Sequence, residues 1–172
     1  NCYLRVEKGE VVIRCSPLFP QSEIEKLIRN HQEEILEQIK GYVPKYNYQE
    51  DGYVYLFNQK YQIVLKDMNI KKCAIHDRQI YVYSKNIQAN IEMFLKQELM
   101  NYLKERIDFY LSTSFHHVFH EIQIKKMKRR WGACFYQKNR VCFNLVLAHI
   151  DYALIDYVIV HELCHFLEAY NS

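Results

Sequence analysis

Two histidines and a glutamate near the end of the chain form the strongest chemical signal in this sequence. They lie in the segment His161-Glu162-Leu163-Cys164-His165. In a helix, residues four positions apart lie on one face about one turn apart, so both imidazoles can bind a single Zn²⁺. The glutamate then lies beside the metal and can accept a proton from the water that the metal polarises. The spacing predicts a metal-dependent hydrolase with His161 and His165 as zinc ligands and Glu162 as general base.

The residues around this motif favour a buried helix over 151–170. The stretch contains no Gly or Pro and begins with Asp151, which suits an N-cap. Its apolar residues recur at helical spacing, at Leu154, Ile155, Val158, Ile159, Leu163, Phe166 and Leu167. An alternative makes both histidines hydrogen-bonded core residues and Glu162 a solvated helix residue. We favour the metal site because the alternative leaves three polar groups in an apolar helix without a shared role.

The composition is typical of a globular protein with one substantial core. The chain has 172 residues, of which 49% are hydrophobic and 25% charged, and its net charge of +3 is too small to indicate polyanion binding by itself. Its six cysteines include no C-x-x-C pair, which favours reduced thiols in a cytoplasmic protein. Neither a leader segment nor an apolar run of about 18 residues is present, so no membrane partner is expected. The abrupt ends of the chain are consistent with a fragment.

The order of the predicted elements indicates an α+β fold. A β-hairpin over 2–15 precedes a helix from Ser22, with a capping box to Glu25, as far as Gly41. Alternating segments predict a small sheet with strands at 53–57, 61–65, 73–76 and 79–83, with Asn58-Gln59 as one of its turns. A long helix at 88–111 and strands at 121–127, 131–136 and 140–145 precede the motif helix. We expect an N-terminal α/β lobe at 1–86 and a catalytic lobe at 87–172, joined in one compact unit.

Three segments in the last third of the chain resemble the YgjP-like metallopeptidase family. They are Arg130-Trp131-Gly132-Ala133-Cys134, Asn144-Leu145-x-Leu147-Ala148, and Ile155-Asp156-Tyr157-Val158-Ile159-Val160 followed by the histidine motif. That family carries R-W-G-S-C and I-D-Y-V-V-V-H-E-L-x-H in the same order. The resemblance is specific over 125–172 and covers the earlier segments only in their order and size.

The resemblance implies a small zincin-like fold of the minigluzincin type, related to the SprT-like proteases. It also implies that His161 and His165 bind zinc and that Glu162 is the general base. The family's third ligand is a histidine in an Asn-His-Ser triplet, which aligns here with Tyr170-Asn171-Ser172, so that Asn171 occupies the third ligand position. An amide oxygen is a poorer zinc ligand than imidazole. Glu168 or a residue beyond Ser172 are the alternative third ligands.

A basic run and two neighbouring residues are candidates for substrate binding. Five of the six residues at 125–130 are basic, which suits the phosphates of a nucleotide or of DNA, or peptide carboxylates. If the same run lies on an edge strand, its solvated charges can instead serve only to prevent aggregation through that strand. Arg130 and Trp131 belong to the family-like motif, and a strand beside the motif helix would hold an extended substrate; a core role for Trp131 is the alternative. Asn144 can bond either a substrate carbonyl or the end of its own strand.

Two further groups of residues are assigned structural roles. His116, His117 and His120 lie at the end of a predicted helix, where histidine suits the helix dipole, and no carboxylate accompanies them at a catalytic spacing. Cys164 lies within the motif but on another face of the helix, and we expect a small apolar filler there.

The leading hypothesis is therefore a zinc-dependent hydrolase, most simply a metallopeptidase acting on a peptide or protein. A second hypothesis comes from the resemblance, since members of that family are also described as nucleoside triphosphate pyrophosphatases acting on UTP. The third is a module with a degenerate site that binds protein or DNA without cutting it, and Asn171 is the reason to consider it.

Overall fold

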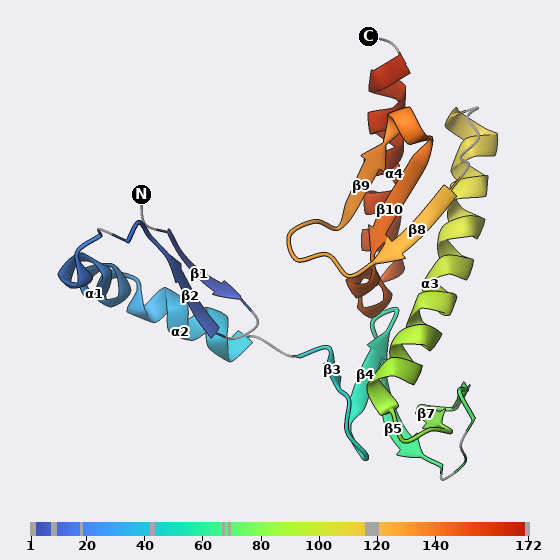
Figure 1. Ribbon diagram of the computed structural model, residues 1–172, viewed down its shortest axis with the longest axis horizontal. Coiled ribbons are helices and arrows are strands. Elements are labelled where there is room, and N and C mark those ends of the chain that lie inside the picture. The colour runs from blue at the N-terminus through green and yellow to red at the C-terminus, as the bar shows by residue number, and fades with distance from the viewer. Residues whose placement is uncertain are drawn as a thin grey trace. The chain divides into compact units, whose positions relative to one another are not determined.

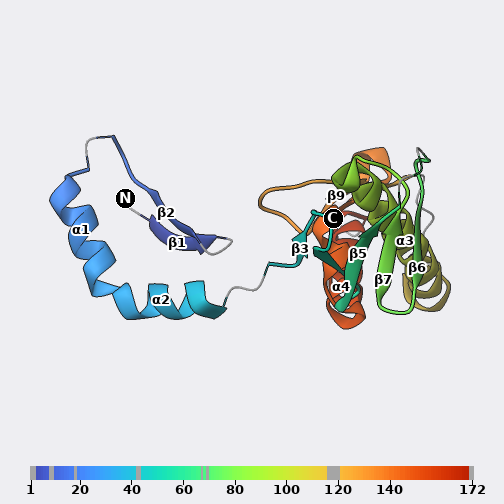
Figure 2. The same ribbon diagram turned by 90° about the horizontal axis from the view of Figure 1, so that it is seen from below.

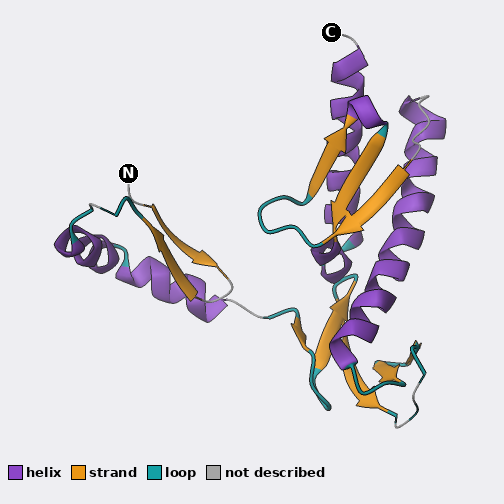
Figure 3. Ribbon diagram, in the orientation of Figure 1, coloured by secondary structure: helices purple, strands orange, loops and turns teal. Residues whose placement is uncertain are grey.

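A computed structural model describes residues 3–7, 10–17, 19–41, 44–66, 68, 70–115 and 121–170 (Figure 1). The chain divides into two compact units, Asn1–Pro44 and Lys45–Ser172. Helices and sheets occur in both units (Figure 3), which confirms the α+β class. In the described part of the chain, no helix combines the length and apolar character that a membrane span requires.

The first unit contains a hairpin and two helices. Strands β1 (Tyr3–Glu7) and β2 (Glu10–Arg14) pair antiparallel, as the alternating pattern predicts. The single predicted helix is instead two, α1 (Gln21–Asn30) and α2 (Gln32–Gly41), which meet at an angle at His31 (Figure 2). The predicted capping box is also absent, because Pro20 occupies the N-cap and makes no side-chain capping bond.

The second unit begins with a five-stranded sheet in the order β3-β4-β5-β7-β6. The strands are β3 (Tyr46–Asn47), β4 (Tyr53–Leu56), β5 (Gln59–Leu65), β6 (Cys73–His76) and β7 (Gln79–Val82). All neighbours are antiparallel except β5 and β7, which are parallel. The turn between β4 and β5 is made by Phe57 and Asn58, both at positive φ, one residue earlier than the predicted turn.

The long helix α3 (Ile87–Tyr110) connects this sheet to the C-terminal part of the unit. Asn86 caps it by accepting the N–H of Ala89 at 3.1 Å. A π-helical turn, Leu111–Phe115, follows. The buried apolar residues of α3 recur every four positions, so they form one continuous stripe: Ile91, Leu95, Leu99, Leu103 and Ile107.

The C-terminal part consists of a three-stranded sheet and the last helix. The sheet order is β8 (Glu121–Lys125), β10 (Arg140–Asn144) and β9 (Gly132–Phe135), with β10 parallel to β8 and antiparallel to β9. A 3-10 helix, Leu145–His149, leads into α4 (Tyr152–Tyr170), which lies against β9 and α3 (Figure 1). Strand β9 is therefore an edge strand beside α4.

One cluster of buried residues includes members of both sheets and of helices α3 and α4 in the second unit. Buried residues of the five-stranded sheet, such as Val54 and Ile63, belong to the same cluster as Phe143 of β10 and Ile159 of α4. The two sheets are also joined by backbone, since the N–H of Phe57 donates to the carbonyl of Ala148 at 2.8 Å. The small sheet thus forms part of the unit that carries the motif helix.

Candidate active site

The histidine motif lies in α4, as predicted. The N-terminus of the helix is capped by Asp151, whose Oδ1 accepts the N–H of Leu154 at 3.0 Å. Ile155, Ile159 and Leu163 face the core. Leu154 was expected to be buried with them, but it is 51% exposed, because it faces a pocket on the other side of the helix.

The two histidine side chains come together at the surface of α4. Nε2 of His161 lies 3.2 Å from Nε2 of His165. Two nitrogens that bind one tetrahedral Zn²⁺ at about 2.0–2.1 Å would lie about 3.3 Å apart, so this pair fits a zinc ion. Both side chains are exposed, which contradicts the alternative that they are core histidines.

A third ligand is not found among the described residues. No group of three His, Cys, Asp or Glu able to hold a metal occurs in the part of the chain that the structure describes. Asn171 and the side chain of Glu168, the two candidates within the sequence, lie outside that part. The same applies to His116, His117 and His120.

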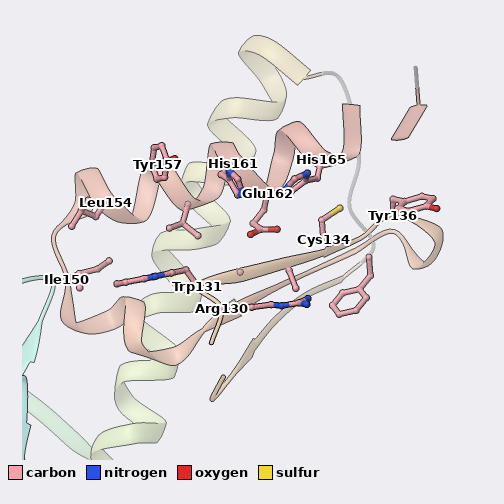
Figure 4. Close-up of a pocket in the computed structure, with 14 residues that line it drawn as sticks. Arg130, Trp131, Cys134, Tyr136, Ile150, Leu154, Tyr157, His161, Glu162 and His165 are labelled. Carbon is pink, nitrogen blue, oxygen red and sulfur yellow. Dashed lines mark hydrogen bonds between the residues drawn. The ribbon is translucent and has the colours of Figure 1, made fainter. Parts of the chain in front are cut away.

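Glu162 is buried, with 5% of its surface exposed, although it lies between two exposed histidines in the motif. Its carboxylate points away from the helix towards β9 (Figure 4). Burial raises the pKa of Glu162, while His161, His165, Arg130 and the backbone N–H of Cys134 oppose that rise. A carboxylate with a raised pKa beside two paired histidines is suited to accept and return a proton.

The space for this carboxylate is provided by Gly132 at the start of β9. Any side chain at this position would collide with Glu162, since even a Cβ there would lie 2.8 Å from its Cδ. The contact with Glu162 therefore explains on steric grounds why a glycine occupies this position of the Arg130–Cys134 segment. Sequence reasoning assigned it no role, because only the packing of β9 on α4 reveals the contact.

The motif lines a pocket of about 1160 Å³ between α4 and β9 (Figure 4). From the helix side it is lined by Leu154, Tyr157, Val158, His161, Glu162 and His165, preceded by Ile150. From the strand side it is lined by Arg130, Trp131, Gly132, Ala133, Cys134, Phe135 and Tyr136. The structure therefore brings together the predicted residues Arg130, Trp131 and Glu162 and the two histidines.

Trp131 is a pocket residue and not a core residue, since 51% of its surface is exposed. Leu154 and Tyr157 were not predicted as site residues. Their spacing of seven and four residues before His161 places them on the same helical face, and that spacing was the available signal. Cys164 lies outside the pocket lining, as expected, but it is exposed at the surface and is not an apolar filler.

The thiol of Cys134 lines the pocket beside Glu162. Burial, followed by the nearby charge of Glu162, raises the pKa of Cys134 to about 11. The thiol is therefore neutral at physiological pH and is a poor nucleophile.

Asn144 does not line the pocket, so its position does not support the predicted contact with substrate. It is buried, and its Nδ2 donates to the carbonyls of Met127 and Arg130, both at 2.7 Å. Its Oδ1 accepts the N–H groups of Met127 and Val146, both at 3.3 Å. The three bonds to Met127 and Arg130 hold the segment before β9, and with it Arg130 and Trp131, against the end of β10. The bond from Val146 is local and joins Asn144 to the 3-10 helix that follows.

The basic run at 125–130 is mostly a loop and not a strand, because β8 ends at Lys125. Within it, Lys126 pairs with Glu92 of α3, with Nζ 2.6 Å from Oε2. Arg130 is the residue of this run that lines the pocket.

A polar cluster fixes α4 against α3 on the side of the helix opposite the pocket. Arg106 donates to both oxygens of Asp156, with Nη2 2.7 Å from Oδ2, and the hydroxyls of Tyr102 and Tyr110 donate to the same carboxylate. Burial would raise the pKa of Asp156, but the hydrogen bonds from Arg106 and Tyr102 outweigh it and hold the pKa below its ordinary value. The cluster fixes the helix at Asp156, five residues before His161.

Comparison with protein families gave a match over nearly the whole chain. The family described as "YgjP-like, metallopeptidase domain" matches residues 1–170. Comparison with curated proteins and with solved structures gave no match.

Proposed function

The chain belongs to the YgjP-like metallopeptidase domain family, and from this premise we propose that it is a zinc-dependent peptidase of the minigluzincin type. The observation that supports the proposal best is the geometry of the motif. The two Nε2 atoms lie at a separation suited to one zinc ion, and a buried carboxylate with a raised pKa lies beside them. The proposed roles are metal binding for His161 and His165 and proton transfer for Glu162.

A bound zinc ion would supply Lewis acidity, which polarises the scissile carbonyl and the attacking water. Residues of this chain would transfer the proton and bind the substrate. Glu162, held by the N–H of Cys134 against Gly132, would take the proton from the water and deliver it to the leaving amine. The exposed edge of β9 would hold the substrate backbone in an extended conformation. We propose either Asn171 or Glu168 as the third zinc ligand.

The pocket lining favours a peptide over a nucleoside triphosphate. Arg130 is the one Lys or Arg among the described residues that line it, and Glu162 adds a carboxylate. A triphosphate carries several negative charges and is normally held by several cations or by a glycine-rich loop at a helix N-terminus. Trp131 and Leu154 instead present apolar surface. We keep a cytoplasmic location as part of the proposal, since the described cysteines are free thiols.

Replacing Glu162 with Gln tests the function directly. We expect zinc content, measured by elemental analysis, to stay unchanged while hydrolysis of an unstructured protein such as casein falls by at least 100-fold. Glu105→Gln on the exposed face of α3 is the matched control and should behave as wild type. Full activity in Glu162→Gln would contradict the proposed mechanism. Release of pyrophosphate from UTP without any peptide cleavage would favour the nucleotide alternative, and wild-type protein that binds zinc but cleaves neither would favour a binding module.

A further inference from the structure

Two exposed apolar side chains face each other across the pocket on one side of the histidine pair. Trp131 comes from the segment before β9 and Leu154 from the first turns of α4, and each is 51% exposed. Figure 4 shows Trp131 extending along the pocket beneath Leu154 towards Ile150. Val158, which is buried, completes this part of the lining. We call these four residues the apolar subsite.

The apolar subsite lies directly beside the reactive groups. Tyr157 forms its rim towards the motif, and the Tyr157 ring lies nearly parallel to the ring of His161 at 6.2 Å between centroids. Leu154 precedes Tyr157 by one helical turn, and Trp131 precedes Gly132, against which the Glu162 carboxylate rests. A peptide whose carbonyl reaches Glu162 and the histidines would therefore place a neighbouring side chain in this subsite.

The chemistry of the subsite selects one class of side chain. Its four residues bear no charge, and Arg130 and Glu162 are the charged non-histidine residues in the described lining of the whole pocket. An apolar side chain that enters is removed from water together with Trp131 and Leu154, and this stabilises the complex. A charged or strongly polar side chain would lose its hydration without gaining a partner.

We propose that this pocket selects peptides with a bulky apolar residue, such as Leu or Phe, next to the scissile bond, and that the apolar subsite binds this residue. The inference rests on the proposed function for the position of the scissile bond. The preference for an apolar side chain does not depend on catalysis, however, and can be measured as binding. One methylene more or less in an apolar pocket typically changes selectivity by about 10- to 200-fold.

Trp131 allows a direct test, because it is the single tryptophan of the chain and its fluorescence reports on the subsite alone. Zinc-loaded Glu162→Gln protein, which should not turn over substrate, is titrated with capped hexapeptides that differ at one central position: Leu, Phe, Ser or Asp. We expect a blue shift of the Trp131 emission and at least tenfold tighter binding for the Leu and Phe peptides. Equal affinity for all four peptides, or emission that does not respond to any of them, would overturn the proposal.

Leu154→Asn should abolish the preference for Leu and Phe, whereas Met93→Asn, an equally exposed change on α3 outside the pocket, should retain it. A preference that survives in Leu154→Asn would also overturn the proposal. The outcomes separate this inference from the proposed function. Peptide cleavage by wild type without any side-chain preference would refute the subsite alone. A preference in binding without cleavage by wild type would support the subsite and refute the peptidase.

Discussion

Gly132 and Glu162 are in direct contact across the interface of β9 and α4. A Cβ on Gly132 would lie 2.6 Å from both Cγ and Oε1 of Glu162. Non-bonded carbon atoms pack at about 3.5–4.0 Å, so this position accepts no side chain unless the carboxylate moves. The backbone of the edge strand thereby sets the position of the proposed general base.

The first prediction follows from this contact. Gly132→Ala should displace the Glu162 carboxylate by about 1 Å, and a misplacement of that size can lower kcat by about 100-fold. Zinc content should not change, because the three atoms nearest to the added Cβ all belong to Glu162. The measurement is kcat on a peptide substrate together with elemental analysis of the purified variant. Activity equal to wild type would show that the carboxylate tolerates the shift or has no catalytic role.

A double-mutant cycle gives the control for that prediction. Glu162→Asp shortens the side chain by one methylene and should relieve the collision. Its effect on kcat should therefore be smaller in the Gly132→Ala background than in wild type, and the two changes should be non-additive. Additive effects would place the cause of the loss elsewhere in β9.

The second prediction concerns the polar cluster between α3 and α4. Asp156→Asn removes the charge that Arg106, Tyr102 and Tyr110 bind, and it should lower the free energy of unfolding by about 2 kcal/mol at pH 7. The pKa of Asp156 is lowered in the fold, so the stability that its charge contributes is present above the ordinary value of 3.8. That contribution is lost as the pH falls through the lower, folded pKa.

Urea unfolding of wild type and Asp156→Asn between pH 7 and pH 3 measures this effect. The difference between the two proteins should be largest at neutral pH and should shrink below about pH 3.8. Asp108→Asn, at an exposed position of α3, is the control and should change stability by less than about 0.5 kcal/mol. A difference that is constant over the whole pH range would mean that the Asp156 charge does not stabilise the fold.

The third prediction tests the role of Asn144 in holding the loop before β9. Asn144→Ala leaves the carbonyls of Met127 and Arg130 and two N–H groups without their partners, which should destabilise the protein by about 2–3 kcal/mol. The released loop should become a better trypsin substrate at Lys128 and Arg129. Limited proteolysis read by mass spectrometry checks this, with the exposed Asn101→Ala on α3 as control. Equal protection of the loop in both variants would contradict the proposed role of Asn144.

The fourth prediction concerns the third zinc ligand. If Asn171 faces the metal, as the aligned motif proposes, Asn171→His should strengthen zinc binding by at least about tenfold, because imidazole is the better zinc ligand. Competition with a fluorescent chelator measures the affinity, and Asn30→His at the end of α1 serves as a control for added histidine. An unchanged affinity, together with a loss in Glu168→Ala, would assign the third position to Glu168.

Local patterns in the chain were sufficient to predict the elements that carry the site. The periodicity of α3 and α4, the N-cap at Asp151 and the strands around β9 and β10 all appear near their expected positions. The pairing of His161 with His165 was predictable for the same reason, since four residues make about one turn of any α-helix. One difference between the predicted and the observed elements is also local. The predicted helix over 22–41 is interrupted at His31, which apolar periodicity alone does not indicate.

The sequence by itself therefore determined the pairing of His161 with His165, their helix and the α+β class, because each depends on residues that are close together along the chain. Only the tertiary structure decided the environment of that pair. The burial of Glu162 against Gly132, the three bonds of Asn144 to Met127 and Arg130, and the exposure of Trp131 beside Leu154 join segments that are 14 to 30 residues apart. Such contacts depend on how β9, β10 and α4 pack on one another, and helical or strand periodicity does not encode that packing.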